Sequence, residues 1–97
     1  MAVMTMVEWD GVTEQQYEAL RRLVNWEADS PKGVSFHVAA FDEHGGHIVD
    51  LWDTAEEFQS FVASRMMPGA RQVGMQGEPS AQIYPVHALF TPGFRPA

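Results

Sequence analysis

The chain contains no cysteine. Disulfide bonds, thiolate catalysis and metal sites with cysteine ligands are therefore excluded. Lysine and arginine are also scarce, because six of them stand against thirteen aspartates and glutamates and leave a formal net charge of -7. Nucleic acids and anionic membrane surfaces are bound through clustered cations, and the six cations form no cluster. We therefore expect no nucleic-acid partner.

Long apolar runs are missing as well. No segment approaches the length of a membrane span. The N-terminal segment 1–6 has no basic residue before its apolar part, and it is too short for the core of a signal peptide. We therefore expect a cytoplasmic protein with no membrane partner.

The chain is rich in apolar residues: 45% of its 97 residues are hydrophobic and 11% are aromatic. This length predicts a single domain, 1–97, with a tail over 91–97 that contains proline and glycine. A chain this short buries only a modest fraction of its surface. We therefore expect a homodimer that buries the excess, with a well-packed monomer as the alternative.

Turn and cap signals divide the chain into six main elements. Thr13 and Gln16 form a capping-box pattern before an apolar stripe of helical spacing. Thr54 is a second helix cap, and Pro68-Gly69 is expected to interrupt the helix that follows. The predicted elements are a strand over 2–9, a helix over 14–28, strands over 34–41 and 47–52, a helix from 54 with one more turn over 70–75, and a strand over 81–90. This β-α-β-β-α-β order predicts an α+β ferredoxin-like fold, with a four-stranded antiparallel sheet and both helices on one face.

The predicted hairpin over 34–52 has two unlike faces, because side chains alternate along strands. One face is apolar apart from His47 at the turn, and it suits a permanent dimer interface; it carries Val34, Phe36, Val38, Ala40, Val49 and Leu51. The other face mixes small, polar and aromatic groups; it carries Ser35, His37, Ala39, Phe41, Ile48, Asp50 and Trp52. A mixed face of this kind is typical of a ligand pocket with a few placed polar groups.

The segment 50–61 carries a resemblance to a known family. Its pattern Asp50-x-Trp52-x-Thr54-x-Glu56-Glu57-Phe58-x-x-Phe61 resembles a motif of the dimeric α/β-barrel superfamily, in which an acidic residue, tryptophan and Ser/Thr precede Glu-Ala-Phe/Leu-x-x-His. The nearest likeness is to antibiotic-biosynthesis-monooxygenase-like domains. The phrases 36–39 and 85–87 are also similar to those of short uncharacterised actinobacterial members.

The resemblance implies two ferredoxin-like sheets that face each other in a dimer, and a ligand pocket between the sheet and the helices of each protomer. Members of the superfamily include cofactor-free monooxygenases, haem-degrading enzymes, polyketide cyclases and lactone isomerases. The chain departs from the motif at two positions. Phe61 stands where histidine is usual, and Asp50 stands where glutamate is usual. The Asn-Trp-His set of the haem-degrading branch is not recognisable.

The candidate catalytic residues are two strand histidines and one carboxylate. His37 and His87 have a side chain suited to general acid or base work near neutral pH, although each can equally be a core, surface or interface histidine. Asp50 lies in an otherwise apolar strand, so it needs a partner. That partner is either a histidine that it orients, or Arg65 or Arg71.

The candidate substrate-binding residues are aromatic: Trp52, Trp26, Tyr17 and Phe61. Each can instead be core, and Tyr17 has a hydroxyl that can polarise a carbonyl. His44 and His47 flank a glycine pair beside Asp42 and Glu43, but their spacing is not that of a metal site, and exposed turn residues explain them better. We expect neither a metal nor an organic cofactor.

Two functions from different classes remain open. The first is a small cofactor-independent enzyme that binds a hydrophobic, oxygenated molecule, aromatic or polyketide-like. His37, with His87 or Asp50, would move a proton in a cyclisation, an isomerisation or a monooxygenation. The second is a non-catalytic dimer of the same fold that binds a ligand or another subunit.

Overall fold

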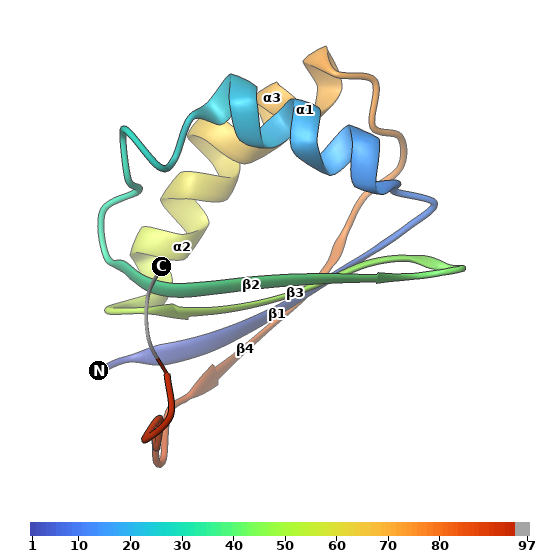
Figure 1. Cartoon of the computed structure of the whole chain (residues 1–97). Helices are drawn as coiled ribbons and strands as arrows, with labels where there is room; N and C mark the ends of the chain where they lie inside the picture. The colour runs from blue at the N-terminus through green and yellow to red at the C-terminus, as the bar shows by residue number, and fades with distance from the viewer. Residues whose placement is uncertain (95–97) are drawn as a thin grey trace.

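Four strands form one antiparallel sheet in the order β2-β3-β1-β4, and the helices lie together on one of its faces (Figure 1). The computed structural model describes residues 1–94. The strands are β1 (Val3–Asp10), β2 (Val34–Asp42), β3 (Gly45–Trp52) and β4 (Ser80–Pro85). The helical layer consists of α1 (Glu14–Val24), α2 (Ala55–Phe61), the π-helical segment η1 (Val62–Met66) and α3 (Met67–Gln72). The predicted ferredoxin-like α+β fold is confirmed.

Helix α1 begins as predicted and ends earlier than predicted. The Thr13 side chain accepts a hydrogen bond from the Gln16 backbone, and the Gln16 side chain accepts one from the Thr13 backbone. The helix ends at Val24, because Asn25 adopts a left-handed conformation with φ 58° and its N–H bonds to Arg21 O. Asparagine tolerates this conformation better than most residues. The predicted end near residue 28 was wrong, and residues 25–28 form turns instead.

The second helical stretch is not broken at Pro68-Gly69 as predicted. After α2 the chain takes one π turn, closed by a bond from Met67 N–H to Val62 O, and then continues as α3. Pro68 lies in the first turn of α3, directly after the π turn. Gly69 is buried against α1. A Cβ atom at Gly69 would lie 2.9 Å from Leu20 Cδ1, so a larger residue there would force the Leu20 side chain to shift.

Strand β4 is shorter than the predicted 81–90. Its register on β1 places Pro85 opposite Val3, and Val86 N–H still bonds to Ala2 O at 3.0 Å. Strand β4 ends at Pro85, and residues 86–94 lie outside the sheet. Of the predicted tail 91–97, residues 95–97 lie outside the described residues.

The core lies between the sheet and the helices, and β1 contributes one face of its side chains to it. Alternate β1 residues are buried: Val3, Thr5, Val7 and Trp9. Two apolar clusters follow, one around Trp9 under α1 and α3, the other around Trp52 under α2. Their buried members are Trp9, Val12, Leu20, Ala70 and Met75, and Val3, Val7, Trp52 and Phe58.

A β-bulge at the start of β2 changes one predicted face. The register shifts between Val34 and Phe36, so Val34 stands opposite Trp52 and packs against the core cluster around that ring. The prediction that Val34 belongs to the apolar outer face was therefore wrong. From Phe36 onward the pairing follows the predicted alternation, because the bulge precedes it.

The sheet face away from the helices is apolar over most of its width, and no helix of the described chain covers it (Figure 1). The strand registers place its residues in three rows. The first row is apolar throughout, the second contains one glutamine, and the third contains Glu8 and His47. The rows are Phe36, Leu51, Met4 and Tyr84; then Val38, Val49, Met6 and Gln82; then Ala40, His47, Glu8 and Ser80. In the described chain, no helix is long and apolar enough to cross a membrane.

Candidate functional site

A cavity of about 580 Å³ lies between the sheet and the helical layer. Its walls are largely apolar, and no lysine or arginine is among the described residues that line it. The polar lining groups are Glu27, Ser30, Ser35, His37 and Asp50, and the larger apolar ones are Leu20, Trp26, Ile48, Trp52, Phe58, Phe61 and Met66. The volume suits a small molecule with few polar groups.

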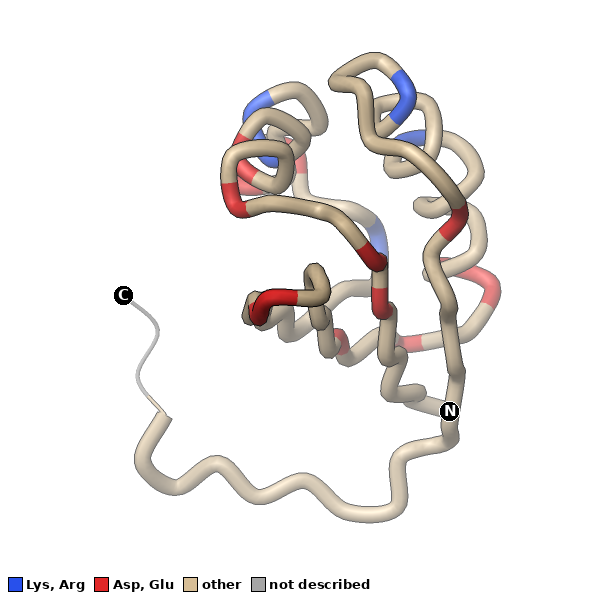
Figure 2. Tube along the Cα trace, turned by 90° about the vertical axis from the view of Figure 1, so that its right-hand side faces the viewer, with Lys and Arg blue, Asp and Glu red and all other residues tan. Residues whose placement is uncertain are grey.

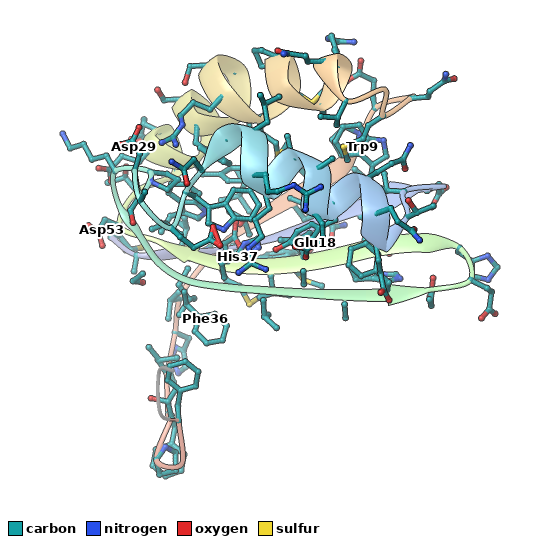
Figure 3. The ribbon with its side chains drawn as sticks, turned by 45° about the horizontal axis from the view of Figure 1, so that its top comes forward. Trp9, Glu18, Asp29, Phe36, His37 and Asp53 are labelled. Atoms are coloured by element: carbon teal, nitrogen blue, oxygen red, sulfur yellow. The ribbon has the colours of Figure 1, made fainter. Side chains whose placement is uncertain are left out.

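His37 and Asp50 meet in this cavity as the strand alternation predicted. They are directly opposed in the β2–β3 pairing, and His37 Nδ1 lies 2.6 Å from Asp50 Oδ1. Asp50 is only 5% exposed, whereas the His37 side chain keeps 30% of its surface accessible. Figure 3 shows His37 beneath α1, between that helix and the sheet.

Trp52 joins the same group from two residues further along β3. Its indole Nε1 donates to Asp50 Oδ2 at 3.3 Å, and the side chain is 1% exposed. The Asp50 carboxylate therefore has two hydrogen-bond partners, one on each oxygen. A buried carboxylate needs such hydrogen-bond partners to offset the loss of water.

Tyr17 extends the chain of hydrogen bonds on the other side of the imidazole. Its hydroxyl lies 2.7 Å from His37 Nε2, and the two rings are nearly parallel. Burial raises the pKa of Tyr17 to about 12, so the phenol is neutral and can donate. With Asp50 accepting from Nδ1–H, Nε2 is the acceptor of the Tyr17 proton; this tautomer is assigned from the network.

The loop after α1 carries Trp26 against this pair of rings. The Trp26 ring centroid lies 5.1 Å from that of His37 and 5.8 Å from that of Tyr17. Tyr17, Trp26 and His37 also line an open outer groove of about 690 Å³ between α1 and β2. Tyr17 is not among the described residues that line the inner cavity, so the Tyr17–His37 bond lies at the boundary between the two spaces.

Arg65 holds the loop in place, a role that the sequence did not reveal. Its Nη2 donates to the backbone oxygens of Val24 and Asp29, both at 2.8 Å, and its guanidinium lies 5.7 Å from the centroid of the Phe61 ring. The predicted alternative that Asp50 pairs with an arginine was wrong. Arg71, the other candidate, contacts Glu78 instead.

Phe61, the departure from the family motif, fills the cavity wall beside Trp52. Their ring centroids are 5.6 Å apart. An imidazole at this position would face the indole. The phenyl ring instead leaves His37 as the one histidine among the described lining residues.

His87 is not part of this site. It lies beyond the end of β4, is exposed, and is not among the described residues that line the cavity. The prediction that His87 shares the cavity with His37 depended on a strand over 81–90, and that strand ends at Pro85. His87 therefore has no contact with the cavity in this protomer.

Thr5 is a buried polar residue that the sequence analysis missed. It stands directly opposite Asp50 in the β1–β3 pairing and is 0% exposed. Its hydroxyl has no hydrogen-bond partner among the described residues. The alternation along β1 was the available signal, because it places Thr5 on the same face as Val3 and Val7.

His47 forms a separate polar cluster on the uncovered sheet face. Its Nε2 lies 2.9 Å from Asp42 Oδ2 and its Nδ1 lies 3.2 Å from Glu8 Oε2. The hydrogen bond to Asp42 raises the pKa of His47, and the backbone N–H of His44 lowers the pKa of Asp42. Within residues 1–94, no group of three or more His, Asp or Glu side chains could hold a metal ion.

Comparison with known proteins identifies the fold. No protein-family model and no curated protein matches the sequence. Among solved structures, the chain is similar to SnoaB, a cofactor-independent oxygenase from Streptomyces nogalater, with TM-score 0.61 and 9% identity over 91% of this chain and 94% of that one. It is also similar to a monooxygenase of Streptomyces coelicolor in complex with nanaomycin D, with TM-score 0.52 and 16% identity over 93% and 91% of the two chains.

A third similar structure has a different activity. The hydroxynitrile lyase of Passiflora edulis matches with TM-score 0.61 and 10% identity, over 93% of this chain and 97% of that one. The chain therefore has the fold of the antibiotic-biosynthesis-monooxygenase-like proteins, as the motif over 50–61 implied. At these identities the likeness shows the fold alone.

Proposed function

We propose that the protein is a small cofactor-independent enzyme that begins its reaction by moving a proton with His37. The observation that carries this proposal is the hydrogen-bonded series Asp50–His37–Tyr17 at the wall of a largely apolar cavity. Asp50 fixes the imidazole with Nδ1 protonated, which makes Nε2 the basic atom.

The proposed substrate is a hydrophobic, oxygenated molecule, aromatic or polyketide-like, with no strongly anionic group. The charged lining groups Glu27 and Asp50 disfavour an anion, and no lysine or arginine of the described lining offsets them. Trp26, Trp52 and Phe61 offer aromatic surface for a ring system. Arg65 keeps Trp26 in place by holding its loop.

The proposed first step transfers a proton from a phenolic hydroxyl, or from a carbon beside a carbonyl, to His37 Nε2. The substrate must replace the Tyr17 hydroxyl as the partner of that nitrogen. The displaced Tyr17 O–H, neutral because its pKa is about 12, can then donate to the oxygen that gains negative charge. This step is common to cyclisation, isomerisation and monooxygenation.

A non-catalytic ligand-binding dimer is the second candidate, and one observation favours it. His37 Nε2 is already occupied by the Tyr17 hydroxyl, so the imidazole can be a structural link between α1 and β2. In that case a ligand would fill the apolar part of the cavity and leave the hydrogen bond in place.

We also propose that the protein is a homodimer through the uncovered sheet face, and that it needs no metal or organic cofactor. Val38 and Tyr84 on this face are each 45% exposed in one protomer. A closer relation to short actinobacterial members of the superfamily is a proposal that rests on the phrases 36–39 and 85–87.

A search for a bound molecule tests the proposed function. Native mass spectrometry of protein purified from cells, without additions, is expected to show an apolar oxygenated molecule of low mass. Once a substrate is found, His37→Ala should lower the rate by about 10²–10⁴. The matched change His87→Ala should leave the rate unchanged. A bound metal or haem in stoichiometric amount would contradict the cofactor-independent proposal.

A further inference from the structure

The outer groove between α1 and β2 is a concave space that adjoins the inner cavity. Its volume is about 690 Å³. Trp26, Glu27 and His37 line both spaces. The groove and the cavity therefore meet along these three side chains, and one molecule of sufficient length can reach from the cavity into the groove.

The basic nitrogen of His37 is directed to the groove side of this boundary. Nδ1 is bonded to Asp50, which lines the inner cavity. Nε2 lies 2.7 Å from the hydroxyl of Tyr17, which among the described residues lines the groove but not the cavity. A substrate that takes the place of this hydroxyl on Nε2 must therefore enter space that opens to the groove. Part of such a substrate then lies outside the inner cavity.

Acidic side chains outnumber basic ones in the groove. Among the described residues, Glu14, Glu18 and Glu27 line it together with one cation, Arg21. Arg21 forms ion pairs with Glu18 and Glu27, so an anionic ligand would have to compete with these carboxylates for the guanidinium. Figure 2 shows both signs of charge on α1, which carries Glu14, Glu18 and Arg21. The charge of the lining therefore favours a cation.

The rest of the lining suits an ammonium group on a short carbon chain. Tyr17, Trp26 and Phe41 supply aromatic rings, and an aromatic ring attracts a cation that lies over its face. The facing wall is formed by residues 38–40 of β2, which is an edge strand of the sheet. Within the described chain, no strand pairs with the outer side of β2, so its carbonyl oxygens there can accept hydrogen bonds from an ammonium group.

We propose that the outer groove binds the amine-bearing end of the substrate, and that the ring system of the same molecule occupies the inner cavity. The reacting hydroxyl or carbon lies between the two ends, at His37 Nε2, in the place of the Tyr17 hydroxyl. The inference rests on the proposed function, which it deepens by naming the substrate class: an aromatic or polyketide-like ring with a protonated amine on a short side chain.

Naphthol probes that differ only in a side chain test this assignment by fluorescence titration. Naphthol itself has no side chain, and three derivatives carry the same propyl chain ended by an amine, a hydroxyl or a carboxylate. We expect the amine probe to bind about tenfold more tightly than the carboxylate probe, with the hydroxyl probe between them. Equal dissociation constants, or tighter binding of the carboxylate probe, would overturn the inference and leave the proposed function standing. A failure of naphthol and all three derivatives to bind would overturn both.

Variants of the groove carboxylates separate a bound amine from a general attraction of cations to an acidic protein. Glu14→Gln with Glu18→Gln should weaken binding of the amine probe about fivefold and leave naphthol binding unchanged. The control Glu43→Gln with Glu56→Gln removes the same charge from two exposed positions outside the groove lining, and should leave both probes unchanged. An equal loss of amine binding in the two double variants would overturn the inference.

NMR spectra of the wild-type protein locate the side chain of the probe. The amine probe should shift the backbone signals of Ala39 and Ala40, which line the groove but are not among the described lining residues of the cavity. Naphthol should leave these two signals in place and shift that of Ile48, which lines the cavity. If the amine probe shifts only the signals that naphthol shifts, the amine does not reach the groove and the inference is wrong.

Discussion

His37 and Asp50 face each other across the β2–β3 hairpin, with His37 Nδ1 2.6 Å from Asp50 Oδ1. This contact is the only hydrogen bond that the described structure shows for His37 Nδ1. Because Asp50 is buried, the imidazole is held in one orientation by a group that cannot itself reach solvent. The catalytic proposal depends on this arrangement.

Asp50→Asn should release the imidazole. A hydrogen bond to a charged group stabilises a protein by about 1.5–3 kcal/mol, so a loss of that order is expected in the free energy of unfolding. The carboxamide can donate as well as accept, so His37 should populate both neutral tautomers, which the nitrogen chemical shifts of the ring report. The exposed Asp53, just after β3, gives the control Asp53→Asn. Equal effects of the two variants would mean that Asp50 has no special role.

Tyr17 should ionise later than an ordinary tyrosine. Burial raises its pKa to about 12, whereas the pKa of a tyrosine in an unfolded chain is about 10. Between these values the unfolded chain has lost a proton that the folded chain keeps, so stability falls as pH rises through this window. Tyr17→Phe should remove this part of the loss of stability at alkaline pH. The free energy of unfolding is measured by chemical denaturation at several pH values. An unchanged alkaline profile in the variant would show that Tyr17 is not the group responsible.

Thr5→Val should be neutral or stabilising. The Thr5 hydroxyl is fully buried with no hydrogen-bond partner among the described residues, and such a group costs about 1–3 kcal/mol. Removing it should raise the free energy of unfolding by up to that amount. Thr5→Ser, which keeps the hydroxyl and loses the methyl group, should instead destabilise. If Thr5→Val destabilises by more than about 1 kcal/mol, the hydroxyl bonds to a group such as Asp50 in solution.

His47 should titrate above its ordinary range, because Asp42 accepts a hydrogen bond from its ring and raises its pKa. A raised pKa means that the folded chain holds this proton more tightly than the unfolded chain. The contribution to stability is complete below the unfolded value of about 6.5 and is lost as pH rises through the folded pKa. Asp42→Asn should bring the pKa down in an NMR titration, and Glu8→Gln should lower it less. The reverse order would contradict the contacts described.

The alternation along the hairpin was enough to predict that His37, Asp50 and Trp52 share a face. Side-chain parity is a local property, and the turn between β2 and β3 kept the register. The position of Val34 on the core face was not predictable, because a bulge depends on how the strand end packs. His87 was misplaced because the length of β4 depends on its pairing with β1, which ends at the Pro85–Val3 pair.

The helical layer shows the same division between local and tertiary effects. The caps Thr13 and Thr54 follow from local hydrogen-bonding chemistry and were predicted correctly. The continuation of the helix through Pro68 was not, because a π turn over Val62–Met66 precedes it and no local sequence signal indicated that turn. Arg65 acts on backbone oxygens more than thirty residues away in sequence, and no sequence pattern indicates such a contact.

The central claim is that His37 is a base that faces the cavity. The most direct test is whether the protein binds nitrophenol in its phenolate form. The phenol and the phenolate have distinct absorption spectra, so the protonation state of the bound probe can be read at a pH where free nitrophenol is mostly protonated. Wild-type protein and His47→Gln are expected to bind the probe with an increased phenolate fraction. His37→Gln is expected to bind it as the phenol. An equal phenolate fraction in wild type and His37→Gln, or no binding to any of the three, would contradict the account.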